Sequence, residues 1–365
     1  MENSKPYSYN DTFVKNLIDD IGSLILGDSS LRVSVHEKLL ELAAANSPQL
    51  NQYWNKTSWG FGIPDQAFKE KSPYLFPMDT VVKTFRTSGT TGQTRGSASY
   101  SQHGIELIKQ SICHSAARHL IKYLQSPVIV RLVPPEEVAP EMVMAFGMEL
   151  IAKTFGHPKL STSVVSSNGF DLQLLQKVLD AAVLDNLPII LLGGSSAFVN
   201  LCVLLKQQNL RWQLPAGSQV VDAGGFKSRA GEIKVEDMRT MVSKTFGVPI
   251  QAFKNIFGMT ELASQLYDAV DSAVGPLGEC PKGNETFVEC YVRSPLTMKR
   301  GENTMGMLEV VDLCIIDRPC TVLTGDLGIA TAEGVAIVGR VARGQSRGCS
   351  LALDEVTIQQ GAINE

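Results

Sequence analysis

The sequence has no cysteine or histidine pattern typical of a metal site. Its seven cysteines form no C-x-x-C pair, and its five histidines are scattered along the chain. A zinc centre built from these ligands is therefore not expected. The odd number of cysteines also argues against a disulfide framework and favours free thiols.

The sequence also lacks a strong charge of one sign and a secretion signal. The formal net charge is −4, and no block of Lys or Arg is longer than two residues. Nucleic acid is therefore not an expected partner. Residues 1–17 have neither the basic start nor the continuous apolar core of a signal peptide, so we expect a cytoplasmic protein.

No stretch predicts a membrane span. The longest apolar run, residues 187–205, is interrupted by Pro188 and by the turn-forming sequence Gly193-Gly194-Ser195-Ser196. These interruptions predict a buried strand, a turn and a helix. The turn faintly resembles the nucleophile elbow of hydrolases, but no Ser-His-Asp set accompanies it, so we expect Ser195 or Ser196 to cap the helix.

The pattern that is present is the alternation of strands and helices typical of an α/β protein. With 365 residues and 44% hydrophobic composition, the chain can bury a large core. Such alternation predicts a mainly parallel, helix-covered sheet. The predicted strands are 128–133, 189–192 and 219–222, and the predicted helices are 104–124, 171–184, 197–209 and 230–246.

The residue patterns along the sequence predict four regions. Short strands and turns follow Pro295, with the clearest strands at 306–311 and 334–338. Residues 1–80 contain helical patterns and no recognisable chemical motif. The predicted regions are a helical N-terminal region (1–80), an α/β core (81–295), a small β-rich subdomain (296–342) and a short mobile tail (343–365).

The segment Thr87–Gly96, TSGTTGQTRG, has the composition of a phosphate-binding loop. Glycines let backbone N–H groups approach an anion, hydroxyls add donors and Arg95 adds a positive charge. The segment is neither a Walker loop nor the dinucleotide fingerprint G-x-G-x-x-G. Its composition alone also fits a polar surface loop.

The segment resembles the phosphate-binding signature T-S-G-T-T-G-x-x-[KR]-G of the adenylate-forming superfamily, which includes acyl-CoA synthetases and firefly luciferase. Three further matches follow in the order of that family. DAGGF at 222–226 resembles the strand and Gly-Gly turn that line the adenine. NIFGMTE at 255–261 resembles the aromatic-G-x-T-E motif, and TGDL at 324–327 resembles the T-G-D motif.

The resemblance implies ATP and Mg²⁺ as cofactors. It assigns Glu261 to Mg²⁺, Thr260 to the α-phosphate, and Asp326 and Arg340 to the ribose. A carboxylate is a suitable ligand for Mg²⁺, although a single glutamate more often lies on a solvated helix face and a single aspartate in a turn. The other implied ATP-binding residues are Thr87, Ser88, Gly89, Thr90, Thr91, Gly92, Arg95, Gly224, Gly225, Phe226, Phe257 and Gly258.

The end of the chain departs from ordinary members of the superfamily. They continue through a G-R-x-D-D-Q-x-K hinge into a mobile lid domain of about a hundred residues. Here Gly339-Arg340-Val341 matches the start of the hinge, but Ala342-Arg343 replaces its acidic pair and the sequence ends at Glu365. We therefore expect the fold of the N-terminal domain of these enzymes, with the large C-terminal lid and its catalytic lysine missing.

This ending, together with LGGS at 192–195 and GGFKS at 224–228, is similar to the acyl-protein synthetase (LuxE) family of bacterial bioluminescence fatty acid reductase complexes. The resemblance runs from about residue 80 to residue 356. In that family a cysteine in a basic, glycine-bearing tail receives the acyl group as a thioester, and Cys349 occupies the matching position. Arg343 and Arg347 favour its thiolate, or alternatively contact ATP.

The resemblance implies that the chain activates a carboxylic acid, expected to be a fatty acid, to an acyl-adenylate with release of pyrophosphate. The acyl group then passes to Cys349 and on to a partner similar to a fatty acyl reductase. One alternative is direct transfer to CoA or a carrier protein. Another is a nucleotide-binding scaffold without catalysis. We expect the four motifs to converge at the ends of the parallel sheet, where such sheets bind ligands.

Overall fold

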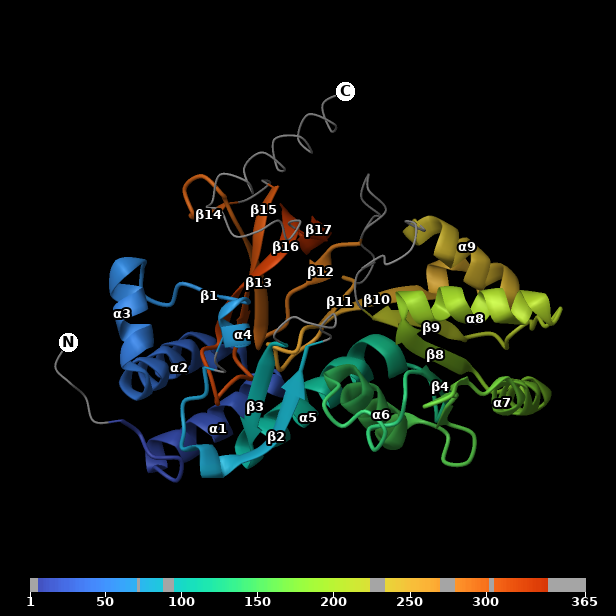
Figure 1. The fold of residues 1–365 in the computed structure, drawn as a ribbon, viewed down its shortest axis with the longest axis horizontal. Coiled ribbons are helices and arrows are strands. Elements are labelled where there is room, and N and C mark those ends of the chain that lie inside the picture. Colours follow the sequence, from blue (N-terminus) through green and yellow to red (C-terminus); the bar gives the residue numbers. More distant parts are fainter. Residues whose placement is uncertain are drawn as a thin grey trace. The chain divides into compact units, whose positions relative to one another are not determined.

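The computed structural model of this protein forms two compact units (Figure 1). Unit 1 is drawn from three parts of the chain, Met1–Thr84, Ser88–Ile108 and Glu261–Glu365, whereas unit 2 consists of Phe85–Thr87 and Lys109–Thr260. Described residues from the N-terminal part and from the C-terminal part of the chain therefore contribute to the same unit. The structure describes residues 6–70, 73–87, 95–223, 234–269, 280–301 and 305–340.

Unit 2 contains the predicted parallel sheet. Its strands lie in the order β10-β9-β8-β4-β5, and each neighbouring pair is parallel. Every residue of β4 and the first five residues of β8 are buried, which is typical of strands that are covered on both faces. The strands are β4 (Val128–Leu132), β5 (Thr162–Ser163), β8 (Ile189–Gly194), β9 (Gln219–Ala223) and β10 (Phe253–Phe257).

Helices α7, α8 and α9 pack beside this sheet (Figure 1). Val128 and Val130 of β4 share one apolar core with Leu179 of α7, Phe198 of α8 and Phe246 of α9. The predicted α/β fold with a helix-covered parallel sheet is confirmed. The helices are α5 (Gln102–Ala116), a π-helical turn (Ala117–Ile121), α6 (Val143–Phe155), α7 (Leu172–Leu184), α8 (Ser195–Gln207), α9 (Val235–Phe246) and a 3₁₀ turn (Ile250–Ala252), and a small hairpin pairs β6 (Val165–Ser166) with β7 (Gly169–Phe170).

Unit 1 contains a mostly antiparallel sheet in the order β12-β17-β16-β15-β13-β14. Strand β1 joins it by pairing in parallel with β16. The sheet includes the strands expected at 306–311 and 334–338, and also strands that precede Pro295. The bounds are β1 (Ile63–Pro64), β12 (Lys282–Gly283), β13 (Val288–Arg293), β14 (Arg300–Gly301), β15 (Met305–Asp312), β16 (Thr321–Thr331) and β17 (Gly334–Arg340).

The N-terminal part of unit 1 is helical. Helix α1 buries Val14, Leu17, Ile21 and Leu24 along one face, the spacing expected of an amphipathic helix. Ser47 caps α3 by accepting the N–H of Leu50. The elements are α1 (Thr12–Ile25), a 3₁₀ turn (Ser29–Leu31), α2 (Arg32–Asn46), α3 (Pro48–Lys56), α4 (Ala67–Glu70), a 3₁₀ turn (Met78–Thr80), and strands β2 (Val81–Arg86) and β3 (Ser97–Ser101), which pair with each other.

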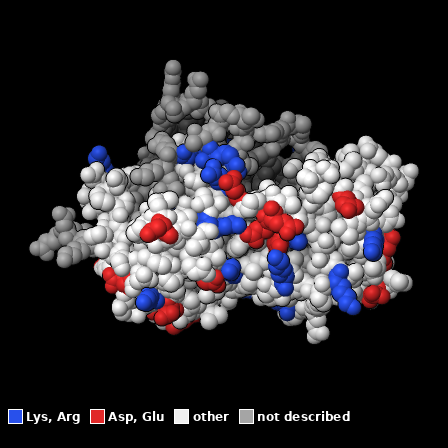
Figure 2. All heavy atoms as spheres, turned by 60° about the horizontal axis from the view of Figure 1, so that its bottom comes forward, with Lys and Arg blue, Asp and Glu red and all other residues white. Residues whose placement is uncertain are grey.

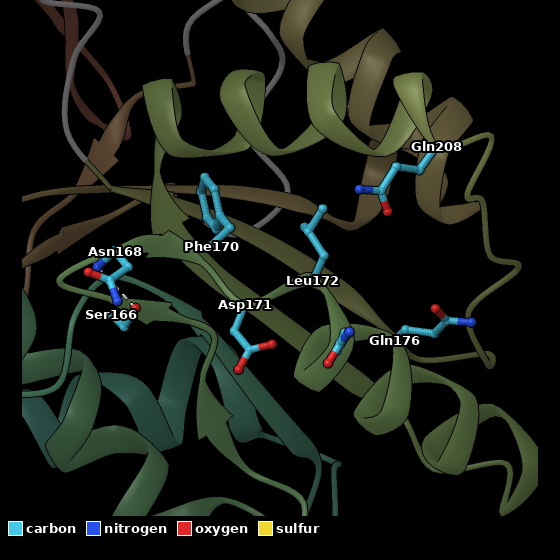
Figure 3. A pocket seen from close by; sticks show the side chains of 8 residues that line it. Ser166, Asn168, Phe170, Asp171, Leu172, Gln176 and Gln208 are labelled. Atoms are coloured by element: carbon cyan, nitrogen blue, oxygen red, sulfur yellow. Dashed lines mark hydrogen bonds between the residues drawn. The ribbon is translucent and has the colours of Figure 1, made fainter.

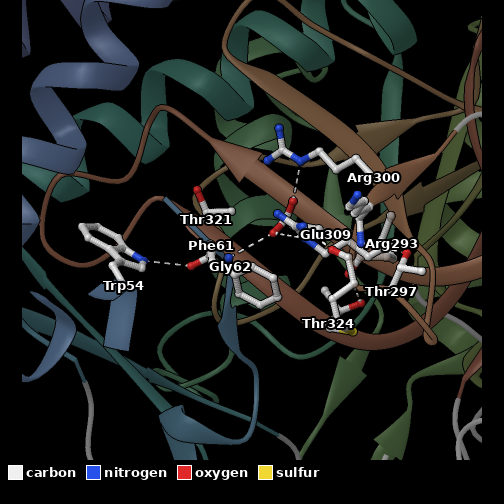
Figure 4. A network of polar contacts seen from close by, with 12 residues as sticks. Trp54, Phe61, Gly62, Arg293, Thr297, Arg300, Glu309, Thr321 and Thr324 are labelled. Atoms are coloured by element: carbon white, nitrogen blue, oxygen red, sulfur yellow. Dashed lines mark hydrogen bonds and ion pairs between the residues drawn. The ribbon is translucent and has the colours of Figure 1, made fainter. Parts of the chain in front are cut away.

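The carboxylate of Glu309 joins β1 to the antiparallel sheet (Figure 4). Glu309 is fully buried and accepts the Nε–H groups of Arg293 and Arg300, each at 2.7 Å. It also accepts the backbone N–H of Gly62 at 3.0 Å, directly before β1. A buried carboxylate with three donors is well compensated. This contact therefore fixes where β1 lies on the sheet.

Acidic and basic side chains are interspersed on the face that Figure 2 shows. This distribution agrees with the small formal net charge of −4. Within the part of the chain that the structure describes, no helix is both long enough and apolar enough to cross a membrane.

Replacing Gly62 by alanine should lower the free energy of unfolding by about 1–3 kcal/mol, the usual range for an overpacked site. A Cβ at this position would lie 2.8 Å from Glu309 Oε1 and 2.9 Å from the backbone nitrogen of Leu323. Urea unfolding measures the change. Gly283→Ala is the matched control, because its Cβ would lie 3.5 Å from Ala269, an ordinary contact. Equal stability of the two variants would contradict the close packing inferred around Gly62, directly before β1.

Candidate functional site

Two of the sequence motifs lie side by side in unit 1: the T-G-D motif and the Gly339-Arg340 pair that matches the start of the hinge. Strands β16 and β17 are antiparallel neighbours, and their register pairs Asp326 of the T-G-D motif with Arg340. Arg340 Nη1 lies 3.8 Å from Asp326 Oδ1. Its Nη2 lies 2.6 Å from Asp65 Oδ2. The arginine is therefore held by a carboxylate on each side.

Asp65 is a site residue that the sequence did not reveal. It follows β1, which the pairing of Ile63 with Val322 places beside β16, and its N–H donates to the carbonyl of Leu323. Its side chain is buried. Asp65 and Arg340 lie 275 residues apart in the sequence. No motif marks Asp65, and only the strand pairing brings it to the site.

Glu261 lies in a turn between β10 and the next short strand, and not on a helix face. It is only 5% exposed, so the alternative of a solvated surface charge does not hold. Burial has the largest effect on its carboxyl and raises the pKa. The backbone N–H of Glu261 and the charges of Arg340 and Arg318 lower this pKa, and the charge of Asp65 raises it. Glu261 is therefore within electrostatic reach of the Arg340 cluster.

The environment of Glu261 fits a ligand of Mg²⁺. Among the described residues, no lysine or arginine forms an ion pair with its buried carboxylate. The described part of the chain also contains no group of three or more His, Cys, Asp or Glu residues able to hold a metal. Mg²⁺ commonly uses one or two protein carboxylates together with water and substrate phosphates. Glu261 could hold an ion of this kind alongside a bound polyphosphate.

In unit 2, Asp222 connects the ends of three parallel strands. Its Oδ2 accepts the hydroxyl of Ser195 at 3.1 Å and the side-chain amide of Asn255 at 2.8 Å. The same amide donates to the carbonyl of Asp222 at 3.1 Å. Asp222 is paired in register with Gly193 of β8 and with Asn255 of β10. These contacts lie at the carboxyl edge of the sheet, where open α/β sheets bind ligands.

The expected capping role of Ser195 or Ser196 is wrong. The N-cap of α8 is Gly194, which has no side chain to cap the helix. Ser195 is the first residue of the helix and is buried. Its hydroxyl points to Asp222 on the neighbouring strand because the helix begins directly at the end of β8. Ser195 therefore contributes to the strand-end cluster.

The remaining predicted site residues are only partly described. Thr87 and Arg95 flank the loop that joins β2 to β3; Thr87 is half-buried and Arg95 is exposed. Phe257 ends β10, Gly258 follows it, and Thr260 is buried. The convergence of all four motifs therefore stays a prediction. Ser88, Gly89, Thr90, Thr91, Gly92, Gly224, Gly225, Phe226, Cys349 and the tail 343–365 lie outside the described residues.

A separate hollow of about 520 Å³ in unit 2 is lined mainly by polar side chains (Figure 3). Asp171, one of its lining residues, caps α7 by accepting the N–H of Leu174 at 2.9 Å. None of the predicted site residues lines this hollow. Its lining residues are Ser166, Asn168, Phe170, Asp171, Leu172, Gln173, Gln176 and Gln208.

Comparison with solved structures finds similar folds among adenylate-forming enzymes. An open conformation of 2-hydroxyisobutyryl-CoA ligase, in complex with 2-HIB-AMP and CoA, is 12% identical with a TM-score of 0.52, covering 91% of this chain and 76% of that one. A long-chain-fatty-acid-CoA ligase from Archaeoglobus fulgidus is 16% identical with a TM-score of 0.48, covering 72% of this chain. McyG A-PCP with phenylalanyl-adenylate is 17% identical with a TM-score of 0.49, covering 93% of this chain.

The chain spans 52% of the length of the fatty-acid-CoA ligase and 60% of McyG A-PCP. At these identities the likeness concerns the fold alone. A search of curated proteins finds no match. The family model for acyl-protein synthetase, LuxE, matches residues 63–357, which is most of the sequence. The chain therefore belongs to the acyl-protein synthetase (LuxE) family.

Proposed function

We propose that this chain uses ATP to activate a carboxylic acid and then carries the acyl group on Cys349. We further propose that the acid is a fatty acid. The observation that supports this most directly is the cluster in unit 1. Glu261, Asp326 and Arg340 come from three separate motifs and share one electrostatic environment. That cluster occurs in a member of the acyl-protein synthetase family.

In the first half-reaction, an oxygen of the substrate carboxylate forms a bond to the α-phosphorus of ATP. The bond from that phosphorus to the bridging oxygen breaks, and pyrophosphate leaves with the electron pair. The hydroxyl of Thr260 donates to the α-phosphate, and Asp326 accepts from the ribose hydroxyls. Asp65 and Asp326 hold the guanidinium of Arg340 in place for the same sugar. Glu261 would be the protein ligand of Mg²⁺, which when bound would supply positive charge to offset that of the leaving pyrophosphate.

In the second half-reaction, the thiolate of Cys349 attacks the acyl carbonyl carbon. The bond from that carbon to the phosphate oxygen breaks, and AMP leaves. The resulting thioester keeps enough acyl-transfer potential to pass the acyl group to a partner, for which an acyl reductase-like protein is proposed. CoA or a carrier protein is the alternative acceptor, and a catalytically inactive nucleotide-binding scaffold is the alternative to both.

Three of the other cysteines, Cys202, Cys290 and Cys320, are poorly suited to this step. Burial raises the pKa of Cys202 to about 11 and that of Cys320 to about 12. Burial also raises the pKa of Cys290. Since the thiolate is the nucleophile, these buried thiols are unreactive near neutral pH. Cys349 lies in a basic, glycine-containing sequence instead.

Glu261→Gln should lower ATP–pyrophosphate exchange by about tenfold or more, because it keeps the shape of the side chain and removes the charge that faces Mg²⁺. The thermal midpoint should not fall, since the buried carboxylate has no ion-pair partner among the described residues. Burial raises the pKa of Glu261, so the wild-type protein should bind Mg²⁺ more tightly as the pH rises through that value.

In the glutamine variant this pH dependence of Mg²⁺ binding should disappear. Glu285→Gln is the control, because Glu285 is also buried in unit 1 but belongs to none of the four motifs. Exchange at the wild-type rate in Glu261→Gln would refute the metal role of Glu261, whereas no acid-dependent exchange in the wild-type protein would refute the proposed activity.

Cys349→Ser should retain ATP–pyrophosphate exchange, because the first half-reaction does not use the thiol. It should lose the hydroxylamine-labile acyl adduct that the wild-type protein forms with ATP and a fatty acid. Intact-protein mass spectrometry detects the adduct, and Cys113→Ser, at a half-buried cysteine, should keep it. An adduct on another cysteine, or CoA thioester formed without any adduct, would contradict the role of Cys349.

A further inference from the structure

Glu261 begins a segment, residues 261–264, whose backbone is held by three buried side chains. Arg318 Nε donates to the carbonyl of Glu261 at 3.1 Å. The hydroxyl of Tyr100 donates to the carbonyl of Leu262 at 2.9 Å. Asp312 Oδ2 accepts the N–H groups of residues 263 and 264, each at 2.7 Å. We refer to Tyr100, Asp312 and Arg318 as the clamp.

The clamp takes the place of regular secondary structure. No helix or strand includes residues 258–265, between β10 and the short strand β11 (Leu266–Tyr267). Buried backbone groups need partners, and helices or sheets usually supply them. Here four successive residues receive those partners from side chains. The position of the Glu261 backbone is therefore set by the clamp.

Two of the clamp residues, Arg318 and Tyr100, hold each other, and Asp312 is held by other neighbours. Arg318 Nη2 donates to the Tyr100 hydroxyl at 2.6 Å, and the guanidinium lies 4.3 Å from the centre of the tyrosine ring. Asp312 Oδ1 accepts the hydroxyl of Ser264 at 2.8 Å and the N–H of Cys314 at 3.1 Å. The three residues come from β3, from the end of β15 and from the connection before β16. All of them belong to unit 1.

The burial of the clamp makes it costly as a purely stabilising device. Tyr100, Asp312 and Arg318 are 1%, 0% and 2% exposed. Within the described residues, Arg318 Nη1 is buried without a hydrogen-bond partner. Apolar side chains often stabilise an interior as well as or better than buried charges do. Charged side chains with directional bonds instead fix one backbone geometry, which is what a metal-ligating carboxylate requires.

We propose that Tyr100, Asp312 and Arg318 are positioning residues that fix the backbone of Glu261, and with it the direction of the carboxylate toward Mg²⁺ and the phosphates. The proposal rests on the metal role of Glu261 in the proposed function. The clamp itself does not touch the substrate. It acts by keeping the ligand oxygen in place before the ion and nucleotide arrive.

Tyr100→Phe is the sharpest test, because it removes one hydroxyl and leaves the buried ring. The variant should exchange pyrophosphate about five- to tenfold more slowly, as expected for the loss of one or two buried hydrogen bonds. The Mg²⁺ concentration for half-maximal exchange should rise several-fold, and the KM for the acid should stay unchanged. Without any ligand, amide hydrogens at residues 262–264 should exchange with deuterium faster than in the wild-type protein.

Tyr53→Phe is the matched control. The hydroxyl of Tyr53 donates to the carbonyl of Gly62 at 2.9 Å, also in unit 1, but it does not contact residues 261–264. This variant should keep the wild-type Mg²⁺ dependence and the wild-type amide exchange at 262–264. Arg318→Lys, which keeps the charge but loses the planar fork, should reproduce the effects of Tyr100→Phe.

The outcomes separate this proposal from the proposed function. Wild-type Mg²⁺ dependence and amide exchange in Tyr100→Phe, with impaired Glu261→Gln, would overturn the clamp and leave the proposed function standing. Equal impairment in Tyr100→Phe and Tyr53→Phe would also overturn it, since the effect would then be one of general stability. Full activity of Glu261→Gln would remove the metal role on which the clamp rests, whereas no acid-dependent exchange in the wild-type protein would remove the proposed function itself.

Discussion

The buried carboxylate of Glu309 is the interaction on which the arrangement of unit 1 depends. It is bonded to two guanidinium groups and to the N–H of Gly62, and solvent does not reach it. Removing one partner of a buried ion pair typically costs about 3–5 kcal/mol, because the remaining charge is left uncompensated. The carboxylate therefore holds β1 on β16. Asp65, which follows β1, thereby reaches Arg340.

Three buried acidic groups in unit 1 differ in how their charge is compensated. Glu309 is neutralised by arginines, and Asp312 is surrounded by N–H and O–H donors. Glu261 is different, because its buried carboxylate receives its own N–H but no ion-pair partner within the described residues. Such a carboxylate is unfavourable in the ionised form until a cation approaches. The contrast separates carboxylates that build the fold from the one that is proposed to bind Mg²⁺.

In unit 2, side-chain hydrogen bonds hold the end of β9 in place. Asn255 binds both the side chain and the main chain of Asp222, so the end of β9 is tied to β10. Ser195 ties it to the start of α8. Strand ends held in this way are rigid supports for the loops that follow them. The DAGGF motif begins at this support, which suits its proposed role beside a nucleotide.

The sequence alone determined the family and the parallel sheet. The alternation of apolar strands with helical periods depends on neighbouring residues, and the four motifs are contiguous segments. Even so, the role of Ser195 was predicted wrongly, because a capping pattern is local and the Asp222 acceptor lies 27 residues away.

Only the tertiary structure decided which buried groups meet. Asp65 and Arg340 lie 275 residues apart, Tyr100 and Arg318 lie 218 apart, and Tyr100 and Leu262 lie 162 apart. No local period encodes such contacts. They follow from strand pairing and from the need of each buried polar group for a partner, a need that can be met from anywhere in the chain.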